Sequence, residues 1–270
     1  DAPMLYLAAA DDAVRSMVLT MATAIAAGAL LIVVARRYNV PAIVLLLFGG
    51  FVLGPNEPLG LGLVQPETLG DGLSVIVSLS IGLILYEGGL TLNLQGYRTA
   101  STVIKRLLTV GVVITWLGTA ALAYLLADLP LDLAIISGSL VIVTGPTVIA
   151  PLLKRVKVNA RTHNILHWEG VLIDPIGVFI ALLCYEWVVD RSAEDAVENL
   201  LLRVGMGLAI GTVIGLLTSQ LVKPRVVPTQ MINIFSLGMG VVAFGLAEAI
   251  RTEAGLLSVT VAGVVYGLSG

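Results

Sequence analysis

Asp174 is the residue of this sequence best placed to do chemistry, because it stands about midway through an apolar run that extends from 163 to 187. Pro175 follows it directly. A proline inside a helix donates no backbone hydrogen bond, so a helix here should kink and free a carbonyl near Val171. A carboxylate beside a free carbonyl offers the oxygen atoms that a proton or a hard cation prefers. The residues therefore predict a proton or cation site at Asp174; the alternative is an aspartate neutralised by burial or paired for structure alone.

Two neighbours of Asp174 on the same run have supporting roles in this interpretation. Glu169 precedes Asp174 by five residues, which in a straight helix is a rise of ~7.5 Å with a large angular offset. Gly170 shares the face of Asp174 and leaves space above its carboxylate. We expect Glu169 to be a supporting ligand and Gly170 and Pro175 to shape the helix, although Glu169 at a helix end on the cytoplasmic side is the alternative.

A second irregular stretch, Thr144–Gly145–Pro146, interrupts the apolar run from 133 to 153. Gly145 followed by Pro146 favours an unwound segment, and irregular backbone at membrane depth persists only where it lines a cavity or is buried in protein. Free carbonyls and the ends of half-helices would then face the ion. We predict that Thr144 adds a hydroxyl ligand to the site of Asp174. A simple proline kink is the alternative.

The elements that must position these residues are membrane-spanning helices. The chain is 57% hydrophobic and 12% charged with a mean hydropathy of +0.99, whereas a soluble domain is about a quarter charged. Most of its apolar runs reach the ~20 residues that cross a bilayer. The sequence predicts an all-α, polytopic transmembrane helical bundle in which residues 1–270 form one transmembrane domain, truncated before its end. The nine predicted segments are 15–35, 41–54, 73–91, 103–126, 133–153, 163–187, 199–222, 231–250 and 255–270.

Charged residues alternate between the junctions of these segments. Most of the 15 Lys and Arg residues follow the odd-numbered segments, as in the basic stretches 154–161 and 223–225, and acidic residues fill the other junctions. Because basic loops stay in the cytoplasm, we expect a multi-pass protein of the cell membrane with its N-terminus outside. Glu186 is assigned to the outer acidic loop.

Other features carry weaker signals. His163 and His167 have the spacing of a metal-ligand pair, but no third ligand accompanies them. The single Cys184 excludes an intramolecular disulfide. A stripe of small residues predicts close helix packing, and its members are Gly205, Gly207, Gly211 and Gly215.

At these residues the sequence resembles the NhaP-type monovalent cation:proton antiporters, the family that includes the sodium/proton exchangers. The resemblance implies an NhaA-like antiporter fold with inverted repeats, an unwound helix, an elevator-like core and a homodimer. It also implies exchange of a monovalent cation, Na⁺ or K⁺, for protons by competition at Asp174, with Thr144 and Glu169 in the same site. The matching pieces are Tyr86–Leu90, Thr144–Pro146, Glu169–Gly170, Asp174–Pro175, Ala254–Leu257 and Val261–Gly263.

Three positions depart from the pattern of that family. Gly145 stands where Asp is usual, Ile173 where Asn is usual, and Gly170 where Ser is frequent. The missing Asp and Asn would form a pair, so losing both leaves no polar group without a partner. The departures therefore bear on ion selectivity more than on transport.

Alternatives within transport are a Kef-like potassium efflux system and a sodium-coupled organic anion symporter on the same fold. A channel needs a continuous polar path instead of one buried site, and a membrane scaffold needs no buried carboxylate. An enzyme is disfavoured because no nucleophile–base pair is visible. The expected partners are the transported ions and the lipid bilayer, with no nucleic acid and no cofactor.

Overall fold

The computed structural model describes residues 2–55, 60–92, 94–145, 153, 156, 158–190, 193–223 and 226–269. Over these residues the chain is helical and contains no strand. It forms two compact units, residues 1–77 and residues 78–270, which are described separately. The expected all-α bundle is confirmed.

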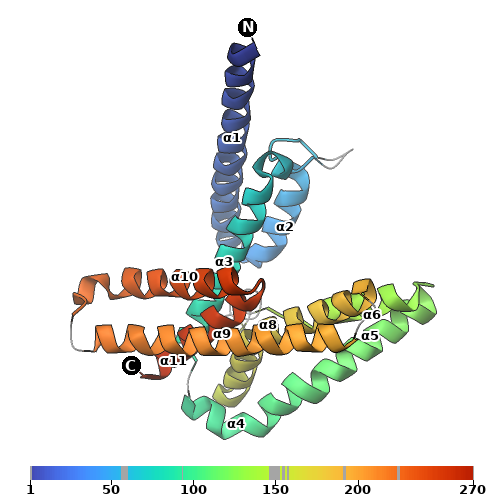
Figure 1. Ribbon diagram of the computed structural model, residues 1–270, viewed down its shortest axis with the longest axis vertical. Helices are drawn as coiled ribbons and strands as arrows, with labels where there is room; N and C mark the ends of the chain where they lie inside the picture. Colours follow the sequence, from blue (N-terminus) through green and yellow to red (C-terminus); the bar gives the residue numbers. More distant parts are fainter. Residues whose placement is uncertain are drawn as a thin grey trace. The chain divides into compact units, whose positions relative to one another are not determined.

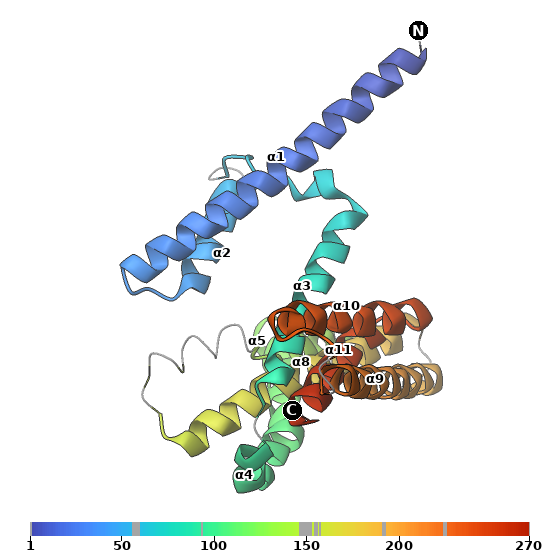
Figure 2. The same cartoon turned by 90° about the vertical axis from the view of Figure 1, so that its left-hand side faces the viewer.

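The first unit pairs a long helix with a short one. Helix α1 (Ala2–Arg37) ends in a turn at Asn39, whose φ is 57°, and α2 (Ala42–Leu53) returns beside it (Figure 2). Gly49 of α2 lies so close to Leu31 of α1 that a larger side chain would collide with it. The 3-10 turn η1 (Pro66–Leu69) rests on α1 through a hydrogen bond of 3.4 Å between the hydroxyls of Thr68 and Thr20. The short second segment of the sequence is thus one unbroken helix of 12 residues.

In the second unit, four elements form what we call the α9–α11 group. They are α3 (Asp71–Leu90) from residue 78 onward, α9 (Ala193–Val222), α10 (Ile232–Ile250) and α11 (Ala254–Ser269), with the turn η3 (Thr229–Met231) leading into α10. Figure 1 shows α9, α10 and α11 side by side, as their contacts require. Their shared core is apolar, with Leu85, Tyr86, Ile214, Ala243, Phe244, Val259 and Ala262 at its centre.

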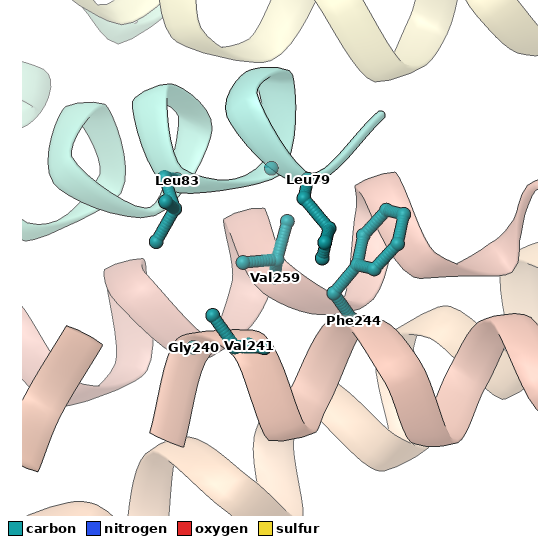
Figure 3. A pocket seen from close by; sticks show the side chains of 7 residues that line it. Leu79, Leu83, Gly240, Val241, Phe244 and Val259 are labelled. Atoms are coloured by element: carbon teal, nitrogen blue, oxygen red, sulfur yellow. The ribbon is translucent and has the colours of Figure 1, made fainter. Parts of the chain in front are cut away.

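The contact between α3 and the other helices of this group is dry. Figure 3 shows Leu79 and Leu83 of α3 facing Phe244 of α10 and Val259 of α11. The recess between these side chains leaves no room for a water molecule. It carries no polar side chain and is therefore part of the packing rather than an ion site.

The remaining elements form the α8 group. Helices α4 (Leu94–Arg106) and α5 (Val112–Leu126) are joined by the π-helical turn η2 (Leu107–Gly111), and α6 (Leu131–Leu140) packs between α5 and α8 (Ala160–Asp190). Two apolar clusters hold this group together, one around Ile104 and Val171 and one around Val112 and Ile173. The fourth apolar segment, expected to begin at 103, is extended at its start by α4, whose last turn carries Lys105 and Arg106.

Within the described residues, six helices are long and apolar enough to cross a membrane: Val14–Arg37, Asp71–Leu90, Ala100–Leu126, Ala160–Val189, Glu194–Val222 and Thr229–Ile250. Three shorter apolar helices are Ala42–Leu53, Leu131–Leu140 and Ala254–Ser269. Each of these nine falls on one of the apolar segments expected from the sequence. The largest difference is in the fifth, where the helix ends at Leu140 although the apolar run continues to 153.

Candidate functional site

The site is built on α8, a helix of 31 residues that continues through Pro175. The helix begins where the side-chain oxygen Oδ1 of Asn159 accepts the backbone N–H of Thr162 at 2.7 Å, which satisfies one of the free donors of the first turn. Because α8 extends past Pro175 in both directions, both predicted carboxylates, Glu169 and Asp174, are carried by a single element.

A non-helical segment, residues 141–145, lies against the middle of α8. Ile142 is buried against Ile173 of α8, so the segment passes α8 at the level of Ile173. Val143 approaches Gly177 so closely that any side chain at position 177 would collide with it. Gly145 has a φ of 54°, a backbone conformation that favours glycine. These contacts bring the middle of the fifth apolar segment to the carboxylates.

Two polar contacts join the 141–145 segment to α8. The hydroxyl of Thr144 donates a hydrogen bond of 2.9 Å to Oε1 of Glu169. The backbone N–H of Gly145 is directed at the carboxylate of Asp174. The second contact uses the peptide group of Gly145 and so does not depend on the aspartate that the family usually has at that position.

The Asp174 carboxylate is incompletely satisfied. Its Oδ1 atom is buried and has no hydrogen-bond partner among the described residues. Glu169 is close enough for its charge to act on Asp174, and in the part of the chain that the structure describes no Lys or Arg forms an ion pair with either group. A buried carboxylate oxygen without a partner is costly unless something binds it. The arrangement can therefore take up one positive charge, either a proton or a cation.

The structure thus brings together four of the residues selected from the sequence: Thr144, Gly145, Glu169 and Asp174. Gly170 is buried one turn before Asp174, and Pro175 is part of the continuous helix. Pro146 lies outside the described residues.

The two histidines are engaged elsewhere. Nε2 of His167 is hydrogen-bonded to the hydroxyl of Thr91 at 3.0 Å, and the ring of His163 stacks on His167 with a centroid separation of 6.0 Å. Within the described ranges, no group of three His, Cys, Asp or Glu side chains has the arrangement of a metal site.

Sequence reasoning missed two features of α8. Gly177 lets the 141–145 segment approach α8. The sequence indicated this role only by the presence of a glycine three residues after Asp174. Glu186, which was assigned to the outer acidic loop, lies inside α8 and forms an ion pair of 2.7 Å with Arg203 of α9. The sequence does contain a signal for this pair, because Glu186 lies near the end of the sixth apolar segment and Arg203 lies near the start of the seventh.

Glu248, another carboxylate near the end of a span, has a local role. Its two oxygens accept the backbone N–H of Glu253 at 2.9 and 3.0 Å, and Oε2 also accepts that of Gly255 at 3.2 Å. The carboxylate therefore caps the first turn of α11, where free N–H donors favour a negative charge.

Comparison with known proteins agrees with this architecture. The family model described as "Sodium/hydrogen exchanger, transmembrane" matches residues 21–270. The K⁺/H⁺ antiporter NhaP2 of Shewanella sp. (strain ANA-3) is 26% identical over 260 residues, covering 95% of this chain and 44% of the relative. The probable Na⁺/H⁺ antiporter 2 of Methanocaldococcus jannaschii is 22% identical over 251 residues, covering 90% of this chain and 58% of the relative. The chain therefore spans about half the length of these relatives.

A solved structure shows the same fold. The sodium proton antiporter MjNhaP1 from Methanocaldococcus jannaschii, at pH 8, superimposes with a TM-score of 0.76 and 19% sequence identity. The superposition covers 95% of this chain and 64% of that protein. With the family model matching most of the chain and the helices arranged as in a known antiporter, this chain belongs to the sodium/hydrogen exchanger family.

Proposed function

We propose that the full-length protein exchanges a monovalent cation, Na⁺ or K⁺, for protons across the membrane by competition at Asp174. One observation carries the proposal: a carboxylate on a membrane-spanning helix keeps a buried oxygen without a hydrogen-bond partner and faces an interrupted segment. The relatives include both a K⁺/H⁺ antiporter and a probable Na⁺/H⁺ antiporter, so the proposal includes both cations.

Competition at one carboxylate couples the two fluxes without a further device. A proton and a monovalent cation each neutralise one negative charge, so Asp174 binds one or the other and not both. Moving the site through the membrane is least costly when its charge is neutralised. The protein therefore carries a cation in one direction and a proton in the other.

The neighbouring residues have defined roles in this proposal. Glu169 adds negative charge near the site, and its hydrogen bond to Thr144 holds the non-helical segment against α8. Gly145 lies in the non-helical 141–145 segment and presents its N–H to Asp174. Gly170 leaves space beside the carboxylate, and Pro175 removes one backbone N–H from the hydrogen bonds of α8 and so favours a kink there. Thr144 supplies a hydroxyl ligand to the site.

We further propose that residues 1–270 belong to one transport domain in the cell membrane, with the N-terminus outside and the full-length protein a homodimer. The alternation of basic and acidic junctions supports the orientation, and the resemblance to the NhaP-type antiporters supports the dimer.

The decisive experiment replaces Asp174 by asparagine in the full-length protein, reconstituted in vesicles with a lumenal pH dye. Asp174→Asn keeps the size and hydrogen-bonding capacity but removes the titratable charge, so cation-driven proton movement should be lost completely. Glu169→Gln should only shift the apparent cation affinity, because Glu169 lies off the face of Asp174. Glu194→Gln, at an exposed position of α9, is the control and should exchange as the wild type does. Wild-type exchange by Asp174→Asn would refute the proposed mechanism.

A further inference from the structure

The α8 group and the α9–α11 group meet along a seam that is packed at one end and loose at the other. At one end, Gly88 of α3 lies against Val171 of α8, and Thr91 bonds to His167. Toward the Asp190 end of α8, the seam holds an apolar cavity of about 280 Å³, open on one side, between α5, α6, α8 and α9. The side chains that line this cavity include Trp116, Leu183, Cys184, Trp187 and Val197.

One ion pair crosses the seam beside this cavity. Oε1 of Glu186 in α8 lies 2.7 Å from Nη2 of Arg203 in α9, and the two side chains are 15% and 12% exposed. Two further polar atoms of the pair, Oε2 of Glu186 and Nε of Arg203, are buried without a hydrogen-bond partner among the described residues. A buried ion pair repays the cost of removing two charges from water only when its remaining donors and acceptors are also satisfied. This ion pair therefore gives little permanent stabilisation to the contact between the two helix groups.

Arg203 also has a second acidic neighbour on its own side of the seam. The charge of Arg203 acts on Glu253, which lies in the turn between α10 and α11. If α8 moved away, Arg203 would retain a carboxylate nearby within the α9–α11 group. Separating the pair therefore leaves only Glu186 to be solvated, and the opening of the seam would supply water to it.

We propose that Glu186 and Arg203 form a latch, which holds the two helix groups together at this end of the seam and separates when α8 moves relative to α9. The inference rests on the proposed function, since one carboxylate on α8 serves both sides of a membrane only if the structure around α8 changes.

Cys184 reports the opening of the seam without any transport assay. Its side chain is 3% exposed and lines the cavity, so a maleimide should label it slowly in the full-length wild type. In the double variant Glu186→Gln with Arg203→Gln, which leaves no buried charge unpaired, labelling should be several-fold faster. The reversed pair, Glu186→Arg with Arg203→Glu, should return the rate toward that of the wild type. An unchanged rate in the double variant, with an unaltered gel-filtration profile, would overturn the latch.

A reversible tether tests the movement directly. In a Cys184→Ala background, cysteines at positions 186 and 203 are joined by a short bifunctional thiosulfonate reagent, which a reductant later removes. Tethering should stop exchange, and reduction should restore it. The matched control places cysteines at Asn199 and Arg251, whose side chains are joined by a hydrogen bond of 3.2 Å within the α9–α11 group. That tether should leave exchange unchanged.

The two proposals fail in different ways. Exchange that continues with the 186–203 tether in place would overturn the latch and leave the proposed function intact. If the wild type and the reduced proteins exchange no cations for protons, the proposed function fails, while the labelling rate of Cys184 still decides the latch.

Discussion

Glu253 shows how much the setting of one residue changes its chemistry. It lies between α10 and α11 with a φ of 68°, and its carboxyl is partly buried beside that of Glu248. Burial and, to a lesser extent, the charge of Glu248 raise the pKa of Glu253, and the nearby Arg203 only partly opposes the rise. The folded protein therefore binds a proton here at a pH at which the unfolded chain has released it.

The raised pKa of Glu253 predicts a pH-dependent change in stability. Because the folded state holds the proton more tightly, the contribution of Glu253 to stability is full below the ordinary glutamate pKa of ~4.3 and falls as the pH rises through the folded-state pKa. Glu253→Gln should therefore raise the melting temperature of the full-length protein in detergent at pH 8 and have little effect at pH 4. A variant that melts like the wild type at both pH values would contradict this, and the exposed Glu194→Gln is the control.

At the site itself, residue types were predictable and their partners were not. An aspartate in the middle of an apolar run is costly, so Asp174 could be selected from the sequence alone. The contacts of Asp174 with the Gly145 peptide and of Glu169 with Thr144 depend on how two segments cross, which no spacing along the chain specifies.

Among the elements, α9 and α11 share the most extensive helix contact of the second unit, and glycines make their close approach possible. A methyl group added at Gly207 would lie 2.9 Å from Cβ of Leu257, and one at Gly215 would lie 2.8 Å from the carbonyl oxygen of Ala262. At Gly211 it would collide with the carbonyl oxygen of Ser258. The predicted packing role of the small-residue stripe is confirmed at these three positions. In a membrane such contacts replace the hydrophobic effect between helices.

Gly211→Ala should therefore destabilise the full-length protein in detergent by ~1–3 kcal/mol, the usual cost of overfilling a packed contact. Gly205 of the same helix supplies a matched control, because nothing lies within 4 Å of a methyl group there. Gly205→Ala should be neutral, or stabilising by up to ~1 kcal/mol through helix propensity. The measurement is the free energy of unfolding of the two variants, compared by denaturant or thermal unfolding under the same conditions. Equal losses would show that the α9–α11 contact is looser than described.

For the whole molecule, the distribution of charge predicts the orientation in the membrane. Basic residues follow alternate segments, and the loops that carry them are expected to lie in the cytoplasm. In a Cys184→Ala background of the full-length protein, a cysteine in place of Ala160 should react with a membrane-impermeant maleimide only from the cytoplasmic side. A cysteine in place of Glu194 should react only from outside. Both positions are exposed, and Ala160→Cys spares the Asn159 cap of α8. The opposite pattern would invert the topology.

The sequence by itself determined the class of molecule, the apolar segments and the candidate carboxylates. These follow from local composition, because in a bilayer a span must be apolar, must satisfy its own backbone and can rarely tolerate a charge. Only the tertiary structure decided where the fifth helix ends, how the 141–145 segment reaches Asp174 past Gly177, and that Glu186 pairs with Arg203 across a seam. Those features arise from contacts between helices far apart in the chain, and such contacts depend on shape and on the partners available to each polar atom, which the order of residues does not display.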